Sequence, residues 1–177
     1  MTVTALRQHR PEVLAELLER YGREIQGLAY LILRNRSAAE DVVVDTLLTA
    51  LDRADTLRND DALRPWLLRV ATNRALAVRR SEARVVTLTV VPDQAAPSVD
   101  EDQRLTLLAA VGRLAPRTRA AVVLRYYADL PVRDVAEALG TSENTVKTQL
   151  REALGQLRRG LEVDQAIGVE AREVLHG

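Results

Sequence analysis

The sequence predicts an all-α protein with two small helical domains joined by an extended linker, the second domain containing a helix-turn-helix. The apolar residues, 47% of the chain, are mostly Leu, Val and Ala, while 3% of all residues are aromatic and Phe is absent. This mix favours helices over a sandwich or barrel. Apolar residues also recur at helical spacing along most of the chain. The exception is "VVTLTVV" followed by "PDQAAPSVDED", which we interpret as an extended segment because a single strand has no partner here.

The chain therefore divides into parts of different character. Its 177 residues suffice for two small domains. The formal net charge of zero hides an alternation, because residues 111–161 are net basic while residues 81–110 and 162–177 are net acidic. Local basic faces thus remain compatible with nucleic-acid binding. The expected parts are an N-terminal domain (8–82), a linker (83–99), a C-terminal domain (100–161) and an acidic tail (162–177).

The composition excludes several kinds of site. The chain has no Cys and only two His, His9 and His176, near its ends, so we expect no disulfide, no metal site and no His-built catalytic site. No apolar run approaches the roughly 20 residues of a membrane span. The N-terminal "MTVTALRQHRPE" lacks the apolar core of a signal peptide. We therefore expect a soluble, cytoplasmic protein that needs no cofactor and makes no membrane contact of its own.

Four helices are expected in the N-terminal domain. Pro11 suits a first helical turn, and apolar residues then recur to Leu33 with an interruption at Gly22. Ser37 can cap the next helix by accepting an amide hydrogen bond. After a polar loop, Pro65 opens a helix that runs to about residue 80.

The C-terminal domain is also expected to hold four helices. Pro116 and Pro131 fall at plausible first-turn positions. The acidic tail is compatible with a short amphipathic helix that folds back on a basic face, or with partial disorder, which we favour. The expected helices span about 101–113, 116–127, 131–139 and 142–160.

The last two helices form the helix-turn-helix. Gly140 supplies the positive φ of a sharp turn, and Ser142 can cap the second helix. Outward positions of that helix carry amide, ammonium, hydroxyl and guanidinium groups, the chemistry that reads bases and phosphates. On these residues alone, a packed helical hairpin and a DNA-binding motif are equally supported. The apolar positions expected to be buried are Val135, Ala136, Leu139, Val146, Leu150 and Leu154.

A run of about 46 residues, "LAPRTRAAVVLRYYADLPVRDVAEALGTSENTVKTQLREALGQLRR", resembles the C-terminal domain of bacterial sigma factors of the extracytoplasmic-function type. The resemblance implies recognition of the minus-thirty-five promoter element in the major groove. Many relatives have arginines where this chain has Gln149 and Glu152, so Glu152 reverses a charge near DNA phosphates. Tyr126 and Tyr127 are interpreted as core residues, with base stacking as the alternative. The implied DNA contacts are Ser142, Asn144, Thr145, Lys147, Thr148 and Arg151.

The segment "AAEDVVVDTLLTAL" is similar to the helix with which this family binds core RNA polymerase. Asp41 and Asp45 lie four residues apart and so share one helical face, which suits arginines on a partner. Val44 and Leu47 depart from the family pattern, which has Gln and an aromatic residue there. Without the resemblance, a solvated acidic face would be favoured, and an acid–base enzyme is rejected because no His or metal motif accompanies the carboxylates. The implied polymerase contacts are Asp41, Val44, Asp45 and Leu48.

The segment "LRPWLLRVATNRALAVRR" and the loop before it resemble the part of the family that captures the melted minus-ten strand. An amide and three cations near one end of a helix suit phosphate and flipped-base contacts. Trp66 is interpreted as a core anchor, and Ala77 departs from the usual Asp. The implied minus-ten contacts are Arg58, Asn59, Asp60, Asn73, Arg74, Arg79 and Arg80.

The resemblance, over about residues 11–80 and 100–160, implies a sigma factor that is not an enzyme. Its expected partners are core RNA polymerase, promoter DNA and an anti-sigma factor. Two other classes of function stay open: a DNA-binding regulator or decoy that no longer activates polymerase, suggested by Val44, Leu47 and Ala77, and a helical protein that acts only through protein interactions.

Overall fold

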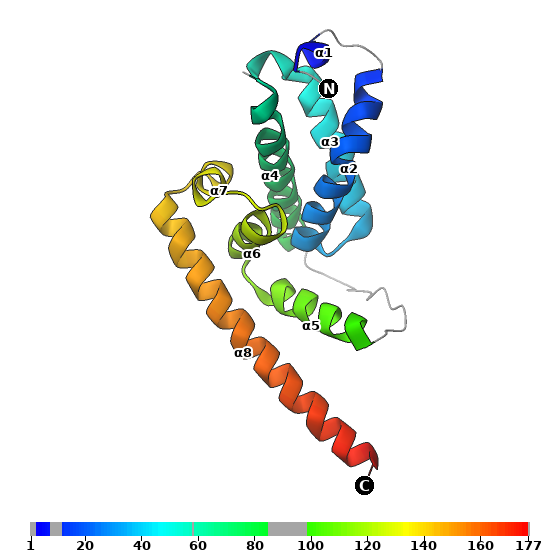
Figure 1. Cartoon of the computed structure of the whole chain (residues 1–177), viewed down its shortest axis with the longest axis vertical. Coiled ribbons are helices and arrows are strands. Elements are labelled where there is room, and N and C mark those ends of the chain that lie inside the picture. The colour runs from blue at the N-terminus through cyan, green and yellow to red at the C-terminus, as the bar shows by residue number, and fades with distance from the viewer. Residues whose placement is uncertain (1–2, 8–11, 58, 85–98, 177) are drawn as a thin grey trace.

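The computed structural model describes residues 3–7, 12–57, 59–84 and 99–176, and every regular element in these ranges is helical (Figure 1). The all-α prediction is therefore confirmed, while the segment "VVTLTVV" lies outside the described residues. The helices are α1 (Val3–Arg7), α2 (Glu12–Leu33), α3 (Arg36–Asp52), α4 (Leu63–Arg84), α5 (Val99–Arg113), α6 (Pro116–Val122), α7 (Val132–Leu139) and α8 (Glu143–His176). Short 3-10 turns at Ala54–Thr56 and Asp60–Ala62 precede α4, and a π-helical turn at Val123–Tyr127 continues α6.

The N-terminal bundle consists of α2, α3 and α4, which pack against one another. Its core is filled by large aliphatic side chains, because Leu and Ile recur every three or four residues and so line one face of each helix. Leu17, Ile25, Leu28 and Leu67 are all essentially inaccessible to solvent. The expected interruption at Gly22 is wrong, since α2 passes through this residue as one helix.

Helix α1 was not predicted from the sequence. It contacts α3 and the turn that follows α3, and it buries Val3 and Leu6. The backbone N–H of Val3 donates a hydrogen bond of 2.6 Å to Oδ1 of Asp60, and Arg7 Nη2 donates one of 2.6 Å to the carbonyl of Leu57. A helix of five residues is too short to show a periodicity of 3.6, so tertiary contacts are its only support.

Two helix starts differ from the expectation. Asn35, not Ser37, caps α3, because its Oδ1 accepts a hydrogen bond of 3.1 Å from the N–H of Ala38. Helix α4 begins at Leu63 rather than Pro65, which lies inside the first turn. Proline is tolerated there because first-turn N–H groups have no partner within the helix.

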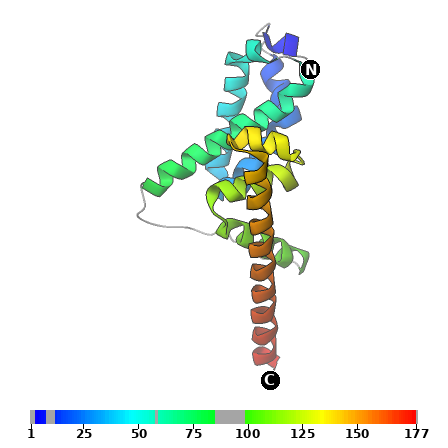
Figure 2. The same cartoon turned by 90° about the vertical axis from the view of Figure 1, so that its left-hand side faces the viewer.

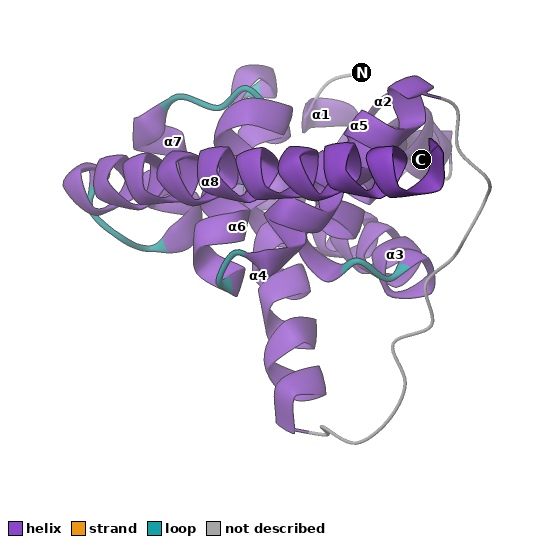
Figure 3. Ribbon diagram, turned by 90° about the horizontal axis from the view of Figure 1, so that it is seen from below, coloured by secondary structure: helices purple, strands orange, loops and turns teal. Residues whose placement is uncertain are grey.

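Helices α5 to α8 form the C-terminal domain, with α5, α6 and α7 each contacting α8. Figure 2 shows α8 extending away from the rest of the molecule as a single straight helix. In Figure 3, where the molecule is seen from below, the same helix runs across the whole picture. The helix was expected to end near residue 160, but it runs to His176. Residues 162–176 of the acidic tail therefore continue this helix.

The two domains lie against each other along a domain seam. We define this seam as the contacts of α2 and α4 with α6, the π-helical turn and α7. In Figure 1, α7 lies beside the middle of α4, while α8 points away from the N-terminal bundle. The seam brings the helix-turn-helix next to the helix that carries most of the expected minus-ten residues.

Candidate nucleic-acid and polymerase interfaces

The turn between α7 and α8 has the geometry that the sequence predicts. Gly140 has a φ of 59°, in the left-handed region that favours glycine. Its N–H and that of Thr141 donate to the carbonyls of Glu137 and Ala136 at 3.2 and 3.0 Å. Arg117 also donates to the carbonyl of Leu139, so three of the last four carbonyls of α7 accept hydrogen bonds from these groups.

Ser142 caps α8 as expected. Its Oγ accepts a hydrogen bond of 3.1 Å from the N–H of Thr145 and lies 2.8 Å from Oγ1 of the same residue. Two hydroxyls predicted to contact DNA therefore also build the start of the helix. Because an N-terminal helix end attracts phosphate, this cap is compatible with a backbone contact to DNA.

The remaining predicted minus-thirty-five residues share the outward face of α8. Asn144, Lys147, Thr148 and Arg151 are all exposed, and no hydrogen bond or ion pair engages these side chains within the described part of the chain. The inward face buries Val146 and Leu150 as predicted, together with Ala153 and Leu157. One side of α8 is therefore buried in the domain, while its other side is polar and exposed. A second macromolecule can contact this exposed side.

Leu154 was expected in the core, but 43% of its surface is exposed. Its place is taken by Ala153 and Leu157, because α8 turns so that positions 146, 150, 153 and 157 face the domain. Gln149 is half-buried, and its Oε1 is enclosed without a hydrogen-bond partner in the described residues. It therefore does not substitute for an arginine on the outward face.

Several residues of the predicted minus-ten set have structural contacts. Arg58 lies outside the described residues. Asn59 caps the 3-10 turn before α4, accepting a hydrogen bond of 3.0 Å from the N–H of Ala62, and Asp60 holds α1. Both side chains remain exposed. They shape the loop, so a change at either one affects its conformation as well as any base contact.

The predicted minus-ten residues on α4 are unevenly accessible. Asn73, Arg74 and Arg80 are exposed, whereas Arg79 is half-buried, with its Nε enclosed and lacking a hydrogen-bond partner in the described part. Trp66 is partly buried and packs against the core. The helix therefore offers an amide and cations in one stretch.

The predicted polymerase residues lie on the exposed side of α3. Val44 is 58% exposed and Leu48 is 47% exposed, and both carboxylates, Asp41 and Asp45, also face solvent. Leu47, in contrast, is buried in the bundle core, so its departure from the family pattern concerns packing.

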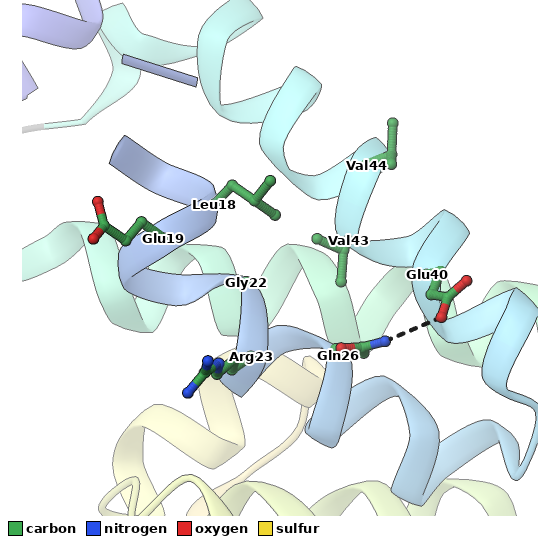
Figure 4. A pocket seen from close by; sticks show the side chains of 8 residues that line it. All are labelled: Leu18, Glu19, Gly22, Arg23, Gln26, Glu40, Val43 and Val44. Carbon is green, nitrogen blue, oxygen red and sulfur yellow. Dashed lines mark hydrogen bonds between the residues drawn. The ribbon is translucent and has the colours of Figure 1, made fainter. Parts of the chain in front are cut away.

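A groove between α2 and α3 adjoins these residues, and the sequence did not indicate it (Figure 4). Leu18 and Val44 line it from opposite helices, while a hydrogen bond of 3.4 Å from Gln26 to Glu40 closes one end. Leu14 and Leu18 are 36% and 53% exposed, although they belong to the same apolar repeat as buried Val13 and Leu17. Val13, Leu14, Leu17 and Leu18 together cover more than one face of α2, and this wide apolar stripe was the sequence signal for an exposed apolar surface.

An ion pair connects two of the predicted surfaces. Arg74 on α4 lies 3.6 Å from Asp45 on α3. An arginine that we expect to bind DNA is therefore paired with a carboxylate that we expect to bind polymerase. Both side chains are about half exposed, and the pair therefore contributes little to stability.

The prediction that Tyr126 and Tyr127 belong to the domain core is wrong, because 54% and 47% of their surfaces are exposed. Partial burial of the phenol, together with the negative charge of Glu24, raises the pKa of Tyr127. Among the described residues, no cluster of His, Asp or Glu is arranged to hold a metal ion, and no helix is long and apolar enough to cross a membrane.

Comparisons with known proteins agree with this geometry. The family model described as Sigma-70 region 2 matches residues 17–85, and the one described as Sigma-70, region 4 matches residues 104–157. The chain is 33% identical over 168 residues to the ECF RNA polymerase sigma factor SigL of Mycobacterium tuberculosis, covering 88% of this chain and 86% of that protein. It is 32% identical over 146 residues to SigM of the same species, covering 81% and 74%.

A solved structure shares the fold. The sigma factor RpoE from Bartonella quintana, crystallised in complex with the anti-sigma factor NepR, superimposes with a TM-score of 0.68 at 22% identity. The match covers 86% of this chain and 99% of that one.

Proposed function

We propose how this chain, which belongs to the ECF family of RNA polymerase sigma factors, divides its work between its surfaces. As a sigma factor it binds core RNA polymerase and directs promoter-specific transcription initiation, and it acts by binding rather than by covalent catalysis. The assignment of individual residues to each contact is our proposal. We place this work in the cytoplasm.

The exposed face of α8 reads the minus-thirty-five element. Asn144, Lys147, Thr148 and Arg151 present base-reading and phosphate-binding groups on one side of a helix whose other side is buried. The capped turn at Gly140 and Ser142 fixes the angle at which this helix leaves α7. This is the single observation that best supports DNA recognition by the C-terminal domain.

The groove between α2 and α3 receives polymerase. Two exposed aliphatic side chains, Leu18 and Val44, line it from opposite helices. Leu48, Asp41 and Asp45 are also exposed on α3. An amphipathic helix that brings aliphatic side chains to the groove and arginines to these carboxylates complements this surface. An anti-sigma factor that competes for the same surface would inhibit this chain, and the relative from Bartonella quintana was solved in complex with an anti-sigma factor.

The exposed part of α4 holds the melted minus-ten strand. Asn73, Arg74 and Arg80 offer an amide and two cations along one helix, beside the loop shaped by Asn59 and Asp60. Bases held outside the duplex shift the equilibrium toward the melted state, since only that state offers them.

In vitro transcription with core RNA polymerase tests the polymerase surface. Asp41→Arg with Asp45→Arg replaces two exposed carboxylates of α3 by cations and should abolish initiation at a cognate promoter. The matched control, Glu16→Arg with Asp55→Arg, makes the same charge change at exposed positions outside the groove and should leave initiation unchanged. Circular dichroism confirms that both variants fold. Normal initiation by the Asp41→Arg, Asp45→Arg variant would remove our assignment of this face of α3.

A further inference from the structure

Helix α1 is hydrogen-bonded to both ends of the loop between α3 and α4. We call this loop the minus-ten loop and define it by its described residues, Leu57 and 59–62. The backbone N–H of Val3 donates to Oδ1 of Asp60, and Nη2 of Arg7 donates to the carbonyl of Leu57, each at 2.6 Å. Figure 1 shows α1 at the end of the N-terminal bundle where α3 passes into α4.

The sequence of α1 explains how so short a helix reaches both ends of the loop. Val3 and Arg7 are four residues apart and therefore lie on one face of the helix. The first N–H groups of a helix have no partner within it, so the N–H of Val3 is available to Asp60. Arg7 lies in the last turn, and its Nε also lies 3.5 Å from the carbonyl of Ala54, just before the loop.

Apolar side chains fix α1 on the bundle. Leu6 has no exposed surface and Val3 is almost completely buried, and the helix contacts α3 and the 3-10 turn at Ala54–Thr56. A helix of five residues is not stable by itself, so α1 depends on these contacts. The docking of α1 and the conformation of the minus-ten loop therefore stabilise each other.

The exposed part of the minus-ten loop has little other support. Leu57 before it and Leu63 after it are buried, but Asn59 and Asp60 are exposed. Within the loop, Oδ1 of Asn59 accepts a hydrogen bond of 3.0 Å from the N–H of Ala62. This cap shapes the 3-10 turn, whereas the contact of Asp60 with Val3 connects the turn to the bundle.

The position of the loop also decides the shape of the surface beside it. Asp60 and Asp61 form one wall of an open recess of about 420 Å³. Polar groups discriminate between bases only within hydrogen-bonding geometry, so a displaced loop would lose selectivity. The other residues that line the recess lie on α2 and at the start of α4: Arg20, Tyr21, Glu24 and Arg64.

We propose that α1 is a positioning element for promoter recognition, in which Val3 and Arg7 hold the minus-ten loop in the conformation that selects bases of the melted strand. Burial of Leu6 alone would cover the end of the bundle, but it would not require the contacts of Arg7 with the loop. The inference rests on the proposed function, because the contact of the loop with the melted strand belongs to that proposal. A loop held in its binding conformation loses less freedom on binding.

Hydrogen exchange in the free protein, followed by NMR, tests whether α1 holds the loop. The N–H groups of Leu57 and Ala62 report on it, because they donate to the carbonyl of Ala54 and to Oδ1 of Asn59. Arg7→Ala should speed exchange at both amides about three- to tenfold. Arg7→Lys keeps a cationic donor and should restore the slower exchange. Unchanged exchange in Arg7→Ala would overturn the inference.

Transcription from a pool of templates tests the consequence for recognition. The pool carries the cognate promoter with a randomised minus-ten element, and sequencing of the transcripts gives the base preference at each position. Arg7→Ala should lower the preference about three- to tenfold at the positions that the loop selects and leave the other positions unchanged. Arg7→Lys should keep the starting preferences, and the affinity of both variants for core RNA polymerase should be unchanged. A preference profile of Arg7→Lys that matches Arg7→Ala would contradict the hydrogen-bond account.

Arg53→Ala is the matched control. It also removes one arginine from an exposed position near the loop, and no hydrogen bond or ion pair engages that side chain within the residues that the structure describes. Exchange and base preferences should both stay at their starting values. The same shift in Arg53→Ala as in Arg7→Ala would assign the effect to net charge and overturn the positioning role.

Leu6→Ser provides a second route, because it weakens the docking of α1 from its apolar side. It should alter the preferences at the same promoter positions as Arg7→Ala, while circular dichroism confirms that the variant remains folded. A uniform loss of transcription with unchanged preferences in both variants would reduce α1 to structural support and overturn the inference.

The two measurements separate this inference from the proposed function. If the starting protein shows no base preference within the minus-ten element, the proposed minus-ten contact fails, while hydrogen exchange still shows whether α1 holds the loop. Faster exchange in Arg7→Ala with unchanged promoter preferences would leave the proposed function intact and overturn the positioning role.

Discussion

The two domains are stabilised in different ways. Among the described residues, ten of the twelve largest fully buried side chains belong to helices α1 to α4, and only Leu124 and Val135 belong to the C-terminal domain. The C-terminal core is rich in Ala, and its helix ends are held by Arg117, Arg119 and Ser142. One domain therefore depends on apolar burial, while the other depends on capping and on docking against its neighbour.

The largest expected effect is in the N-terminal core. Leu28→Ala removes a side chain with no exposed surface and should lower the free energy of unfolding by about 2–5 kcal/mol. Urea denaturation measures this loss, and Leu48→Ala, at an exposed site on α3, should cost much less. Equal losses for the two variants would contradict the account of the bundle as a burial-stabilised domain.

Arg119→Ala should be the most damaging change in the C-terminal domain. It leaves the carbonyls of Ile32, Gly112 and Leu114 without this donor and should cost about 3 kcal/mol, because hydrogen bonds from a charged donor are among the stronger ones. Thermal unfolding by calorimetry measures the loss. Arg125→Ala removes a more exposed guanidinium and serves as the control. A loss at Arg119 no greater than at Arg125 would show that capping does not hold this domain.

Gly140→Ala isolates backbone conformation. No heavy atom lies within 4 Å of a Cβ built at this position, so the expected loss of about 1–2 kcal/mol comes from the left-handed φ alone. Gly112→Ala also enters open space, but without a positive φ, and should be neutral or slightly stabilising. If both variants behave alike in denaturant titrations, the turn does not require glycine.

Glu152→Arg probes the DNA-facing side with the smallest expected effect on stability. The residue is exposed beside Arg151, and the change replaces an anion by a cation near phosphates. Affinity should rise for all DNA sequences, and the slope of log affinity against log salt should steepen by about one unit. Fluorescence anisotropy over a salt series measures both. Tightening at one sequence only would mean that Glu152 reads a base, with cytosine the expected partner.

The sequence predicted correctly those features that depend on residues close together in the chain. The turn at Gly140, the cap at Ser142 and the outward set on α8 each depend on residues within a few positions, and all three are present. The prediction failed for features that depend on contacts between residues far apart in the chain. The exposure of Leu18 depends on how α3 packs beside α2, and helix α1 depends on Asp60 and Leu57.

The domain seam was equally inaccessible to sequence reasoning. Arg119 matched the family motif, yet its partners lie on α2 and α5, and no spacing within α6 indicates them. Tyr127 was expected to pack in the core of the C-terminal domain. Its ring instead bridges toward α2, where Gly27 leaves room for it.

The ion pair between Asp45 and Arg74 has a consequence for cooperativity. On the proposed assignment, an arginine of polymerase that engages the Asp45 carboxylate releases the Arg74 guanidinium for a DNA phosphate. Polymerase would then raise the affinity for the melted strand without any movement of the backbone. Thermodynamic reciprocity requires the melted strand to tighten polymerase binding by the same factor. Two half-exposed side chains thus suffice to make promoter opening and polymerase retention favour each other.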